Sequence, residues 1–283
     1  MKYYKALILL YNLFFVISCA TPGLTERQKT AKIIAEKAGF QRIIFNTELF
    51  KLYGWQKIDN IDKKALVIYI EGDGKAWQGR FKVSKNPTPV NPIALRLAVQ
   101  DKRANIIYLA RPCQFFAIQS INSCQSKYWT SHRYSQEIIN AYNTVLRRII
   151  ERYGIDELSV VGFSGGGVIA ALLVAQRSDI VSLTTVASNL DHFNWSLHHK
   201  VSSLNGSLSV YPYISALVEV TQFHLWGSND SIVPFKVNKN LLSHLLKYKT
   251  VNYTVYNGFD HLCCWAEQWP DILNKNKLRM ENN

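Results

Sequence analysis

One stretch, residues 158–177, limits what this chain can fold into more than any other. It opens with a strand-forming run, residues 159–161, that is too short for a helix. It closes with the alanine- and leucine-rich run 168–175, which suits a buried helix, and glycines fill the turn between them. A short strand that leads through a tight turn into a buried helix is typical of proteins in which strands and helices alternate.

The turn itself reads Gly-Phe-Ser-Gly-Gly at residues 162–166 and matches the G-x-S-x-G pattern of a nucleophile elbow. In such a turn Ser164 has to adopt a strained backbone that lifts its hydroxyl above the sheet, and side chains at Gly162 and Gly166 would collide. The following helix directs its free N–H groups at the point where an oxyanion forms. The alternative is a plain glycine-rich turn, so the pattern alone only suggests a nucleophile.

The composition predicts a well-packed globular chain with a basic surface. Of the 283 residues 48% are hydrophobic, and 7 Trp, 15 Tyr and 13 Phe supply the bulk for a large core. The formal charge of +13 is spread along the chain and accompanies no nucleic-acid-binding motif. We therefore expect no nucleic-acid partner, and a solvated basic surface that is able to attract an anionic membrane face.

The N-terminus predicts export. Lys2 and Lys5 precede an apolar run, residues 6–17, that is too short for a comfortable membrane span. The run ends in Val-Ile-Ser-Cys at residues 16–19, which resembles the bacterial lipobox.

The lipobox resemblance implies a signal peptide over residues 1–18, a lipid on Cys19 and a linker over residues 19–24. Ala20, where an aspartate would signal retention, implies no inner-membrane retention. We therefore expect an exported protein held by its lipid at a bacterial membrane, the outer membrane, facing the periplasm or the cell surface. The alternatives are an ordinary signal peptide cleaved near Ala20 and an uncleaved anchor.

Export places the remaining cysteines in an oxidising compartment. Cys113 and Cys124 lie eleven residues apart in one polar loop and are the natural pair for a disulfide. Cys263 and Cys264 are adjacent, and a vicinal disulfide, two free thiols or pairing elsewhere all stay open. No C-x-x-C or H-E-x-x-H spacing occurs, so we expect neither a metal nor another cofactor.

Hydrophobic patterning predicts a single domain, residues 25–278, in which strands alternate with helices around one mostly parallel sheet. We expect a loop over residues 79–92, an excursion over the site at residues 192–217 and a polar tail from Asp271 onward. A capping box at residues 25–28 is expected to open the first helix. The predicted helices are residues 25–38, 93–99, 131–153, 168–175 and 235–248, and the predicted strands are residues 43–45, 49–55, 65–70, 105–110, 159–161, 181–187, 220–226 and 251–256.

Three residues that follow predicted strands form a Ser…Asp…His series, Ser164, Asp230 and His261. The carboxyl ends of parallel strands open on one edge of the sheet, so the three side chains can converge there. His261 would act as general base toward Ser164, and Asp230 would orient the imidazole.

The oxyanion donors would be the Gly165 N–H and a second N–H from the loop after strand 65–70, at Asp73 or Gly74.

Each member of the series has rivals. Asp230 could instead cap the next helix, and Asn229 or Asp191 could supply the orienting group, since Asp191 also follows a strand. The chain has 7 histidines, but His261 alone lies just past the final predicted strand.

Across nearly all of the region after the signal peptide, the chain resembles an α/β-hydrolase, and more narrowly a poorly characterised family of exported bacterial hydrolases. The resemblance implies the α/β-hydrolase fold and supports the roles of Ser164, Asp230 and His261. The sequence departs from the family pattern at two positions. Cys264 stands where a glycine is expected, and Glu71 replaces the histidine of the usual His-Gly oxyanion motif. The matching motifs are residues 71–74, 86–89, 111–114, 128–130, 162–167, 189–191 and 260–261.

The favoured hypothesis is a serine hydrolase that cleaves an ester, thioester or amide of a small acyl substrate through an acyl-enzyme on Ser164. A non-catalytic surface lipoprotein that uses the fold to bind a ligand or partner is the alternative from a different class. An acyltransferase on the same three residues keeps the chemistry and changes the acceptor. The sequence names neither the acyl group nor the oligomeric state.

Overall fold

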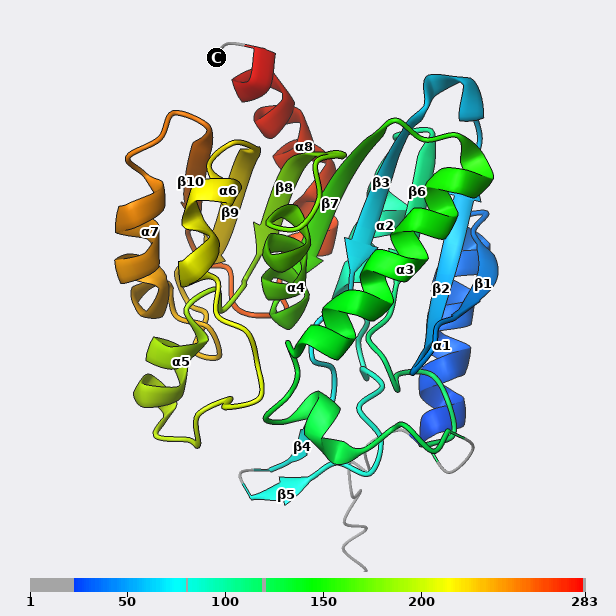
Figure 1. The fold of residues 1–283 in the computed structure, drawn as a ribbon, viewed down its shortest axis with the longest axis horizontal. Coiled ribbons are helices and arrows are strands. Elements are labelled where there is room, and N and C mark those ends of the chain that lie inside the picture. The colour runs from blue at the N-terminus through cyan, green and yellow to red at the C-terminus, as the bar shows by residue number, and fades with distance from the viewer. Residues whose placement is uncertain (1–22, 80, 119–120, 282–283) are drawn as a thin grey trace, which may run out of the picture.

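The computed structural model describes residues 23–79, 81–118 and 121–281, and it is built around one eight-stranded sheet (Figure 1). The strand order is β1-β2-β6-β3-β7-β8-β9-β10, and of these eight strands β2 alone runs opposite to the others. This is the mostly parallel sheet that the sequence predicts. The strands are β1 (Gln41–Asn46), β2 (Lys51–Ile58), β3 (Ala65–Ile70), β6 (Asn105–Leu109), β7 (Glu157–Phe163), β8 (Ile180–Val186), β9 (Thr221–Gly227) and β10 (Val251–Tyr256).

Helices cover both faces of this sheet (Figure 1). One face carries α1 (Leu24–Lys37), α2 (Ile93–Gln100) and α8 (Trp265–Glu281). The other carries α3 (Gln136–Tyr153), α4 (Gly165–Val174), α6 (Ile214–Leu217) and α7 (Lys239–Leu245). Because side chains alternate along a strand, β3 sends Leu66, Ile68 and Ile70 into one core and Val67 and Tyr69 into the other. A strand that is buried on both faces has to be apolar throughout, which is why β3 was recognisable.

Smaller elements gather at the edge of the sheet where the parallel strands end. Helix α5 (His192–His199) and a short turn, η4 (Tyr211–Tyr213), occupy the predicted excursion. A two-stranded hairpin, β4 (Trp77–Gln78) with β5 (Lys82–Val83), stands at the start of the predicted loop over residues 79–92. Two single turns, η3 (Ser126–Trp129) and η5 (Phe235–Asn238), follow β6 and β9. A third, η1 (Ile61–Lys63), precedes β3 and so lies at the opposite edge.

Four predicted helix starts were wrong. Helix α4 begins at Gly165 rather than at residue 168, and α7 begins at Lys239 rather than at residue 235, because the turn η5 precedes it. Helix α1 begins at Leu24 with Gly23 in the capping position and no side-chain cap, so Thr25 lies inside the helix and the predicted capping box is not formed. Helix α3 begins at Gln136 rather than at residue 131, because the chain is still extended at Ser135.

The predicted polar tail from Asp271 was also wrong, since Asp271 lies in the middle of helix α8. Trp265, Trp269 and Ile272 are buried against the sheet face that carries α2, and the Trp269 indole N–H donates to the Tyr69 hydroxyl at 2.9 Å. These apolar residues recur at helical spacing, but polar residues fill the other positions and hide the pattern.

Within the described part of the chain, no helix combines the length and the hydropathy that crossing a bilayer requires.

Candidate active site

Strand β7 and helix α4 meet in the sharp turn that the glycine pattern predicts. Ser164 stands at their junction with φ 50° and ψ −123°, a conformation that non-glycine residues rarely adopt. A Cβ added to Gly162 would lie 2.4 Å from the Gly166 carbonyl oxygen, so a side chain has no room there. The Ser164 carbonyl accepts from the Ser188 hydroxyl at 2.8 Å and from the Gly167 N–H at 3.0 Å, which holds the turn in place.

The predicted acid and base are brought together at the same edge. Nδ1 of His261 lies 2.8 Å from Oδ2 of Asp230, whose side chain is fully buried. The other carboxylate oxygen accepts from the backbone N–H groups of Ile232 at 2.9 Å and Val233 at 2.7 Å. Both Asp230 oxygens therefore have partners, and the Nδ1 contact leaves Nε2 as the ring nitrogen available to a substrate or nucleophile.

The second contact of the series, between Ser164 and His261, is not formed. Within the described residues no hydrogen bond joins the Ser164 hydroxyl to His261. The His261 ring instead packs on Phe163, the residue before Ser164, with ring centroids 5.1 Å apart. Catalytic hydrogen bonds are often long or unformed in enzymes without substrate, so the missing contact does not exclude the pairing.

Asp191, the main rival of Asp230, is committed elsewhere. It caps helix α5, where its Oδ1 accepts from the Asn194 N–H at 3.0 Å. Its Oδ2 accepts from the Asn194 side-chain amide at 2.7 Å and from the Tyr211 hydroxyl at 2.7 Å. Asp230, and not Asp191, is therefore the acid in contact with the histidine.

The loop after β3, which contains the predicted oxyanion residues Asp73 and Gly74, packs directly on the nucleophile turn. Gly165 opens helix α4, and a Cβ on it would lie 2.2 Å from Oδ1 of Asp73. The loop is held by the Gln114 side-chain amide, which donates to the Gly72 carbonyl at 3.0 Å. Gly74 has φ +63° and lies so close to the Pro87 carbonyl oxygen that a Cβ would come within 2.1 Å of it.

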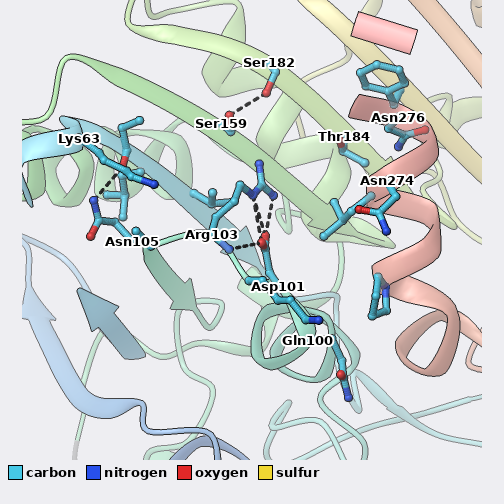
Figure 2. Close-up of a pocket in the computed structure, with 18 residues that line it drawn as sticks. Lys63, Gln100, Asp101, Arg103, Asn105, Ser159, Ser182, Thr184, Asn274 and Asn276 are labelled. Carbon is cyan, nitrogen blue, oxygen red and sulfur yellow. Dashed lines mark hydrogen bonds and ion pairs between the residues drawn. The ribbon is translucent and has the colours of Figure 1, made fainter. Parts of the chain in front are cut away.

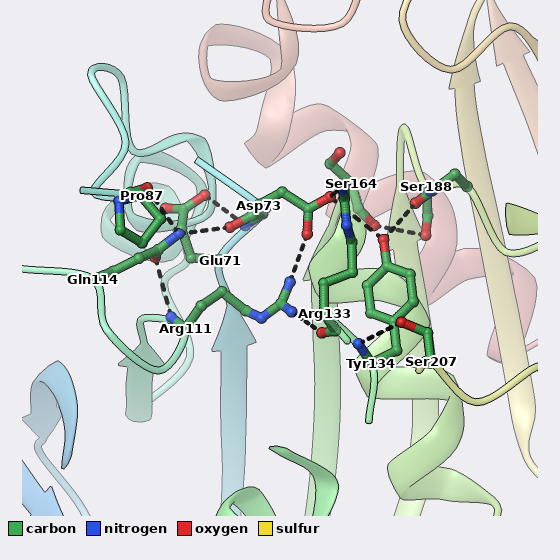
Figure 3. Close-up of polar contacts among 12 residues, drawn as sticks. Glu71, Asp73, Pro87, Arg111, Gln114, Arg133, Tyr134, Ser164, Ser188 and Ser207 are labelled. Carbon is green, nitrogen blue, oxygen red and sulfur yellow. Dashed lines mark hydrogen bonds and ion pairs between the residues drawn. The ribbon is translucent and has the colours of Figure 1, made fainter. Parts of the chain in front are cut away.

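A buried cluster around Asp73 escaped the sequence analysis, which gave its arginines no role. Asp73 accepts from Nη1 of Arg111 at 2.8 Å and from Nη1 of Arg133 at 2.6 Å, and Figure 3 shows this cluster beside Ser164. The Tyr134 hydroxyl donates to Asn189 at 3.2 Å and lies 3.4 Å from Asp73. A charged residue such as Arg111, directly after a fully buried strand, was the signal that could have pointed to the cluster.

The two carboxyl groups of this loop differ in charge. Burial favours the neutral form of Asp73, but the charges of Arg133 and Arg111 outweigh it and hold the Asp73 pKa below its usual value. Glu71 has no cationic partner among the described residues, and burial raises its pKa to about 7 against the hydrogen bonds from Gly72 and Tyr108.

The cysteines after residue 22 are paired. One disulfide joins Cys113 to Cys124 in the loop after β6, and a second joins the neighbours Cys263 and Cys264, which the sequence left open. Cys19, the predicted lipidation site, lies outside the described residues.

A cavity of about 660 Å³ lies at the opposite edge of the sheet (Figure 2). Ser159, near the start of β7, lines it together with Arg103 and Asn276, and no predicted site residue does. Five residues of extended strand, about 16 Å, separate Ser159 from Ser164. The cavity is therefore separate from the candidate active site. In the described part of the chain, no group of three or more His, Cys, Asp or Glu side chains is arranged to hold a metal ion.

The sequence matches one family model, described as serine hydrolase (FSH1), over residues 87–258, which is more than half of the chain. This span contains Ser164 and Asp230 and ends just before His261. None of the curated proteins matches the sequence.

Several solved structures share the fold. A membrane phospholipase A described as a bacterial virulence factor is 14% identical, with a TM-score of 0.58 over 91% of each chain. An esterase of Pyrococcus furiosus is 13% identical, with a TM-score of 0.57 over 85% of this chain and 91% of its own. Est1E from Butyrivibrio proteoclasticus is 11% identical, with a TM-score of 0.56 over 86% of this chain and 99% of its own. At these identities the likeness establishes the architecture.

Proposed function

The chain belongs to the FSH1 serine hydrolase family, and from this premise we propose that it cleaves an acyl ester, thioester or amide through an acyl-enzyme on Ser164. The observation that carries the proposal is the 2.8 Å contact between His261 and Asp230 at the edge where Ser164 stands in its strained turn. The phospholipase and esterase among the structures of like fold favour an ester as the substrate.

In the proposed reaction, Nε2 of His261 takes the Ser164 proton as the hydroxyl oxygen attacks the substrate carbonyl carbon. Asp230 keeps Nδ1 protonated and stabilises the positive charge that forms on the ring. The carbonyl oxygen becomes an oxyanion next to the Gly165 N–H and an N–H of Asp73 or Gly74. His261 then protonates the leaving group, and water activated by the same ring releases the acid and restores Ser164.

The test compares two aspartates that both follow strands at this edge. Ser164→Ala should lower kcat by about 10⁴–10⁶ and abolish labelling by a fluorophosphonate. Asp230→Asn should lower kcat by about 10⁴, because the histidine loses its orienting acid. Asp191→Asn is the matched control, and we expect it to keep kcat within about tenfold, because Asp191 serves helix α5. Equal losses in the two aspartate variants, or an unlabelled folded enzyme, would refute the proposed series.

The same assay identifies the molecule that accepts the acyl group. Product analysis with added alcohols separates hydrolysis, which yields the free acid, from acyl transfer, which yields a new ester. We propose water as the acceptor, in keeping with the hydrolase family. We also propose that Cys19 carries a lipid that tethers the enzyme to a bacterial membrane, which mass spectrometry of the N-terminal peptide tests.

A further inference from the structure

Helix α5 presents its apolar side to solvent. Phe193 and Leu197 are spaced by four residues and therefore share one side of the helix, and Val201 follows the end of the helix. Phe193 is 59% exposed, Leu197 61% and Val201 42%. The opposite side of the helix faces the protein. There the Trp195 indole N–H donates to the Ile232 carbonyl oxygen at 2.7 Å, and Nε2 of His199 lies 2.9 Å from the same oxygen. Amphipathic surface helices normally bury the apolar side, so this arrangement is inverted.

Other exposed apolar residues stand close in the chain to the residues of the candidate active site. Ile232 follows Asp230 by two residues and Leu262 follows His261, and both are more than half exposed. The hairpin β4–β5 begins four residues after Asp73, lies beyond the same edge of the sheet (Figure 1) and exposes Trp77 and Phe81, the latter to 86%. We call these residues the apolar rim; its members are Trp77, Phe81, Phe193, Leu197, Val201, Ile232 and Leu262.

Basic residues accompany the parts of the rim in the hairpin and at helix α5. No acidic residue occurs between Gly74 and Gln100 or over residues 192–218. Lys82 and Lys85 beside the hairpin and Lys200 at the end of α5 are exposed, and they form no ion pair within the described residues. Exposed aromatic and aliphatic residues flanked by lysines match a lipid interface, where apolar side chains enter the acyl boundary and lysines meet anionic headgroups.

We infer that the apolar rim docks on the surface of an anionic lipid bilayer and holds the mouth of the active site against it. A second copy of the chain is disfavoured as the occupant, since its lysines would face those of the first copy. Docking by itself does not depend on the catalytic residues. The consequence for the substrate, an acyl ester presented in the bilayer, rests on the proposed function.

The first experiment tests whether the rim itself contacts the bilayer. It uses the full chain with Cys19→Ser to remove lipidation and Ser164→Ala to prevent turnover. An environment-sensitive fluorophore is attached at Leu197→Cys or, as control, at Ile61→Cys, which is 52% exposed but lies at the opposite edge of the sheet before β3. With phosphatidylglycerol-containing vesicles we expect emission at position 197 to rise and shift to the blue, and emission at position 61 to stay unchanged.

The second experiment measures vesicle affinity and turnover in chains that carry Cys19→Ser. Phe193→Ser with Leu197→Ser should weaken binding and turnover of a vesicle-borne ester by about tenfold or more, while kcat/KM for a soluble short-chain ester stays within about twofold. The matched control is Ile61→Ser with Val181→Ser, two exposed apolar residues at the far edge. Lys82→Gln and Lys85→Gln should each lower affinity for anionic vesicles about fivefold and leave neutral vesicles unaffected.

The outcomes separate docking from catalysis. Equal emission changes at positions 197 and 61, equal losses in the rim and control variants, or a rim that buries itself in a dimer or on an acidic protein without binding vesicles would overturn the inference. Vesicle binding through position 197 without turnover of any soluble ester would leave docking intact and refute the proposed function instead.

Discussion

Two carboxyl groups that lie two residues apart after β3 have pKa values shifted in opposite directions. Asp73 is ionised between two guanidinium groups, and Glu71 is buried with only neutral hydrogen-bond donors around it. A buried ion pair is costly to break, because the partner left behind is an unpaired buried charge. Asp73 and Glu71 therefore determine both the local electrostatics beside Ser164 and part of the pH dependence of the stability of the fold.

Glu71→Gln should remove a pH dependence of stability. With a folded pKa near 7 and an unfolded value of 4.5, Glu71 takes up a proton on folding, so its contribution to stability falls as the pH rises from about 4.5 to 7. The loss amounts to about 3 kcal/mol above pH 7. Urea unfolding at pH 5 and pH 8 should show the wild type losing stability relative to Glu71→Gln. Parallel pH profiles for the two proteins would contradict this.

Asp73→Asn should destabilise the fold at neutral pH and have less effect at low pH. The lowered pKa means that the carboxylate stabilises the fold above about pH 4 and that this contribution is lost as the pH falls through the folded pKa. At pH 7 we expect a loss of about 3–5 kcal/mol, because Arg111 and Arg133 remain buried without their anion. Differential scanning calorimetry from pH 7 down to pH 2 checks this, and a difference between the two proteins that stays constant over the whole range would contradict it.

The sequence predicted only part of this site. The common edge of Ser164, Asp230 and His261 could be predicted because residues that follow parallel strands lie at one edge of the sheet. Arg133 was missed because nothing local distinguishes an arginine that pairs across 60 residues of chain from one in solvent. Ion pairing of that kind is a property of the folded chain.

At the scale of elements, β3 and β10 have the predicted bounds because their signal is local: an unbroken apolar run in β3, strand-forming residues in β10. Helix α8 was missed because only one side of it is buried. Most of its positions face away from the core and are polar, so the apolar spacing is hard to see in the sequence. Pro270 inside the helix weakened the signal further.

The burial of α8 makes a prediction that a polar tail would not. Trp269→Ala should cost about 3–5 kcal/mol of unfolding free energy, because it opens a cavity under the helix and removes a partner of the Tyr69 hydroxyl. Its exposed neighbour provides the control, and Gln268→Ala should stay within about 0.5 kcal/mol. Chemical denaturation measures both, and similar values for the two variants would mean that α8 does not pack as described.

At the scale of the whole molecule, one sheet separates two cores that share every central strand. Trp129 and Trp226 belong to one core, and Trp55, Trp265 and Trp269 belong to the other. Because β3 contributes side chains to both, neither core can be lost without the other. This is the physical basis for the proposal that residues 25–278 form a single domain.

A single domain should unfold in a single step. Thermal melting followed by far-ultraviolet circular dichroism and by tryptophan fluorescence should give the same midpoint, since the two probes then report one transition. Fluorescence midpoints that differ between Trp226→Phe and Trp55→Phe variants, beyond the shift seen by circular dichroism, would reveal two units that melt independently.

The loop that carries His261 is fixed by the helix that follows it. The Trp265 indole N–H donates to the Asp260 carbonyl at 3.1 Å, and the Trp265 ring is fully buried. The ribosome makes these residues after Ser164 and Asp230, so a nascent chain that already contains both still lacks His261 and helix α8. In the proposed mechanism, synthesis thus delays the reaction until α8 has docked.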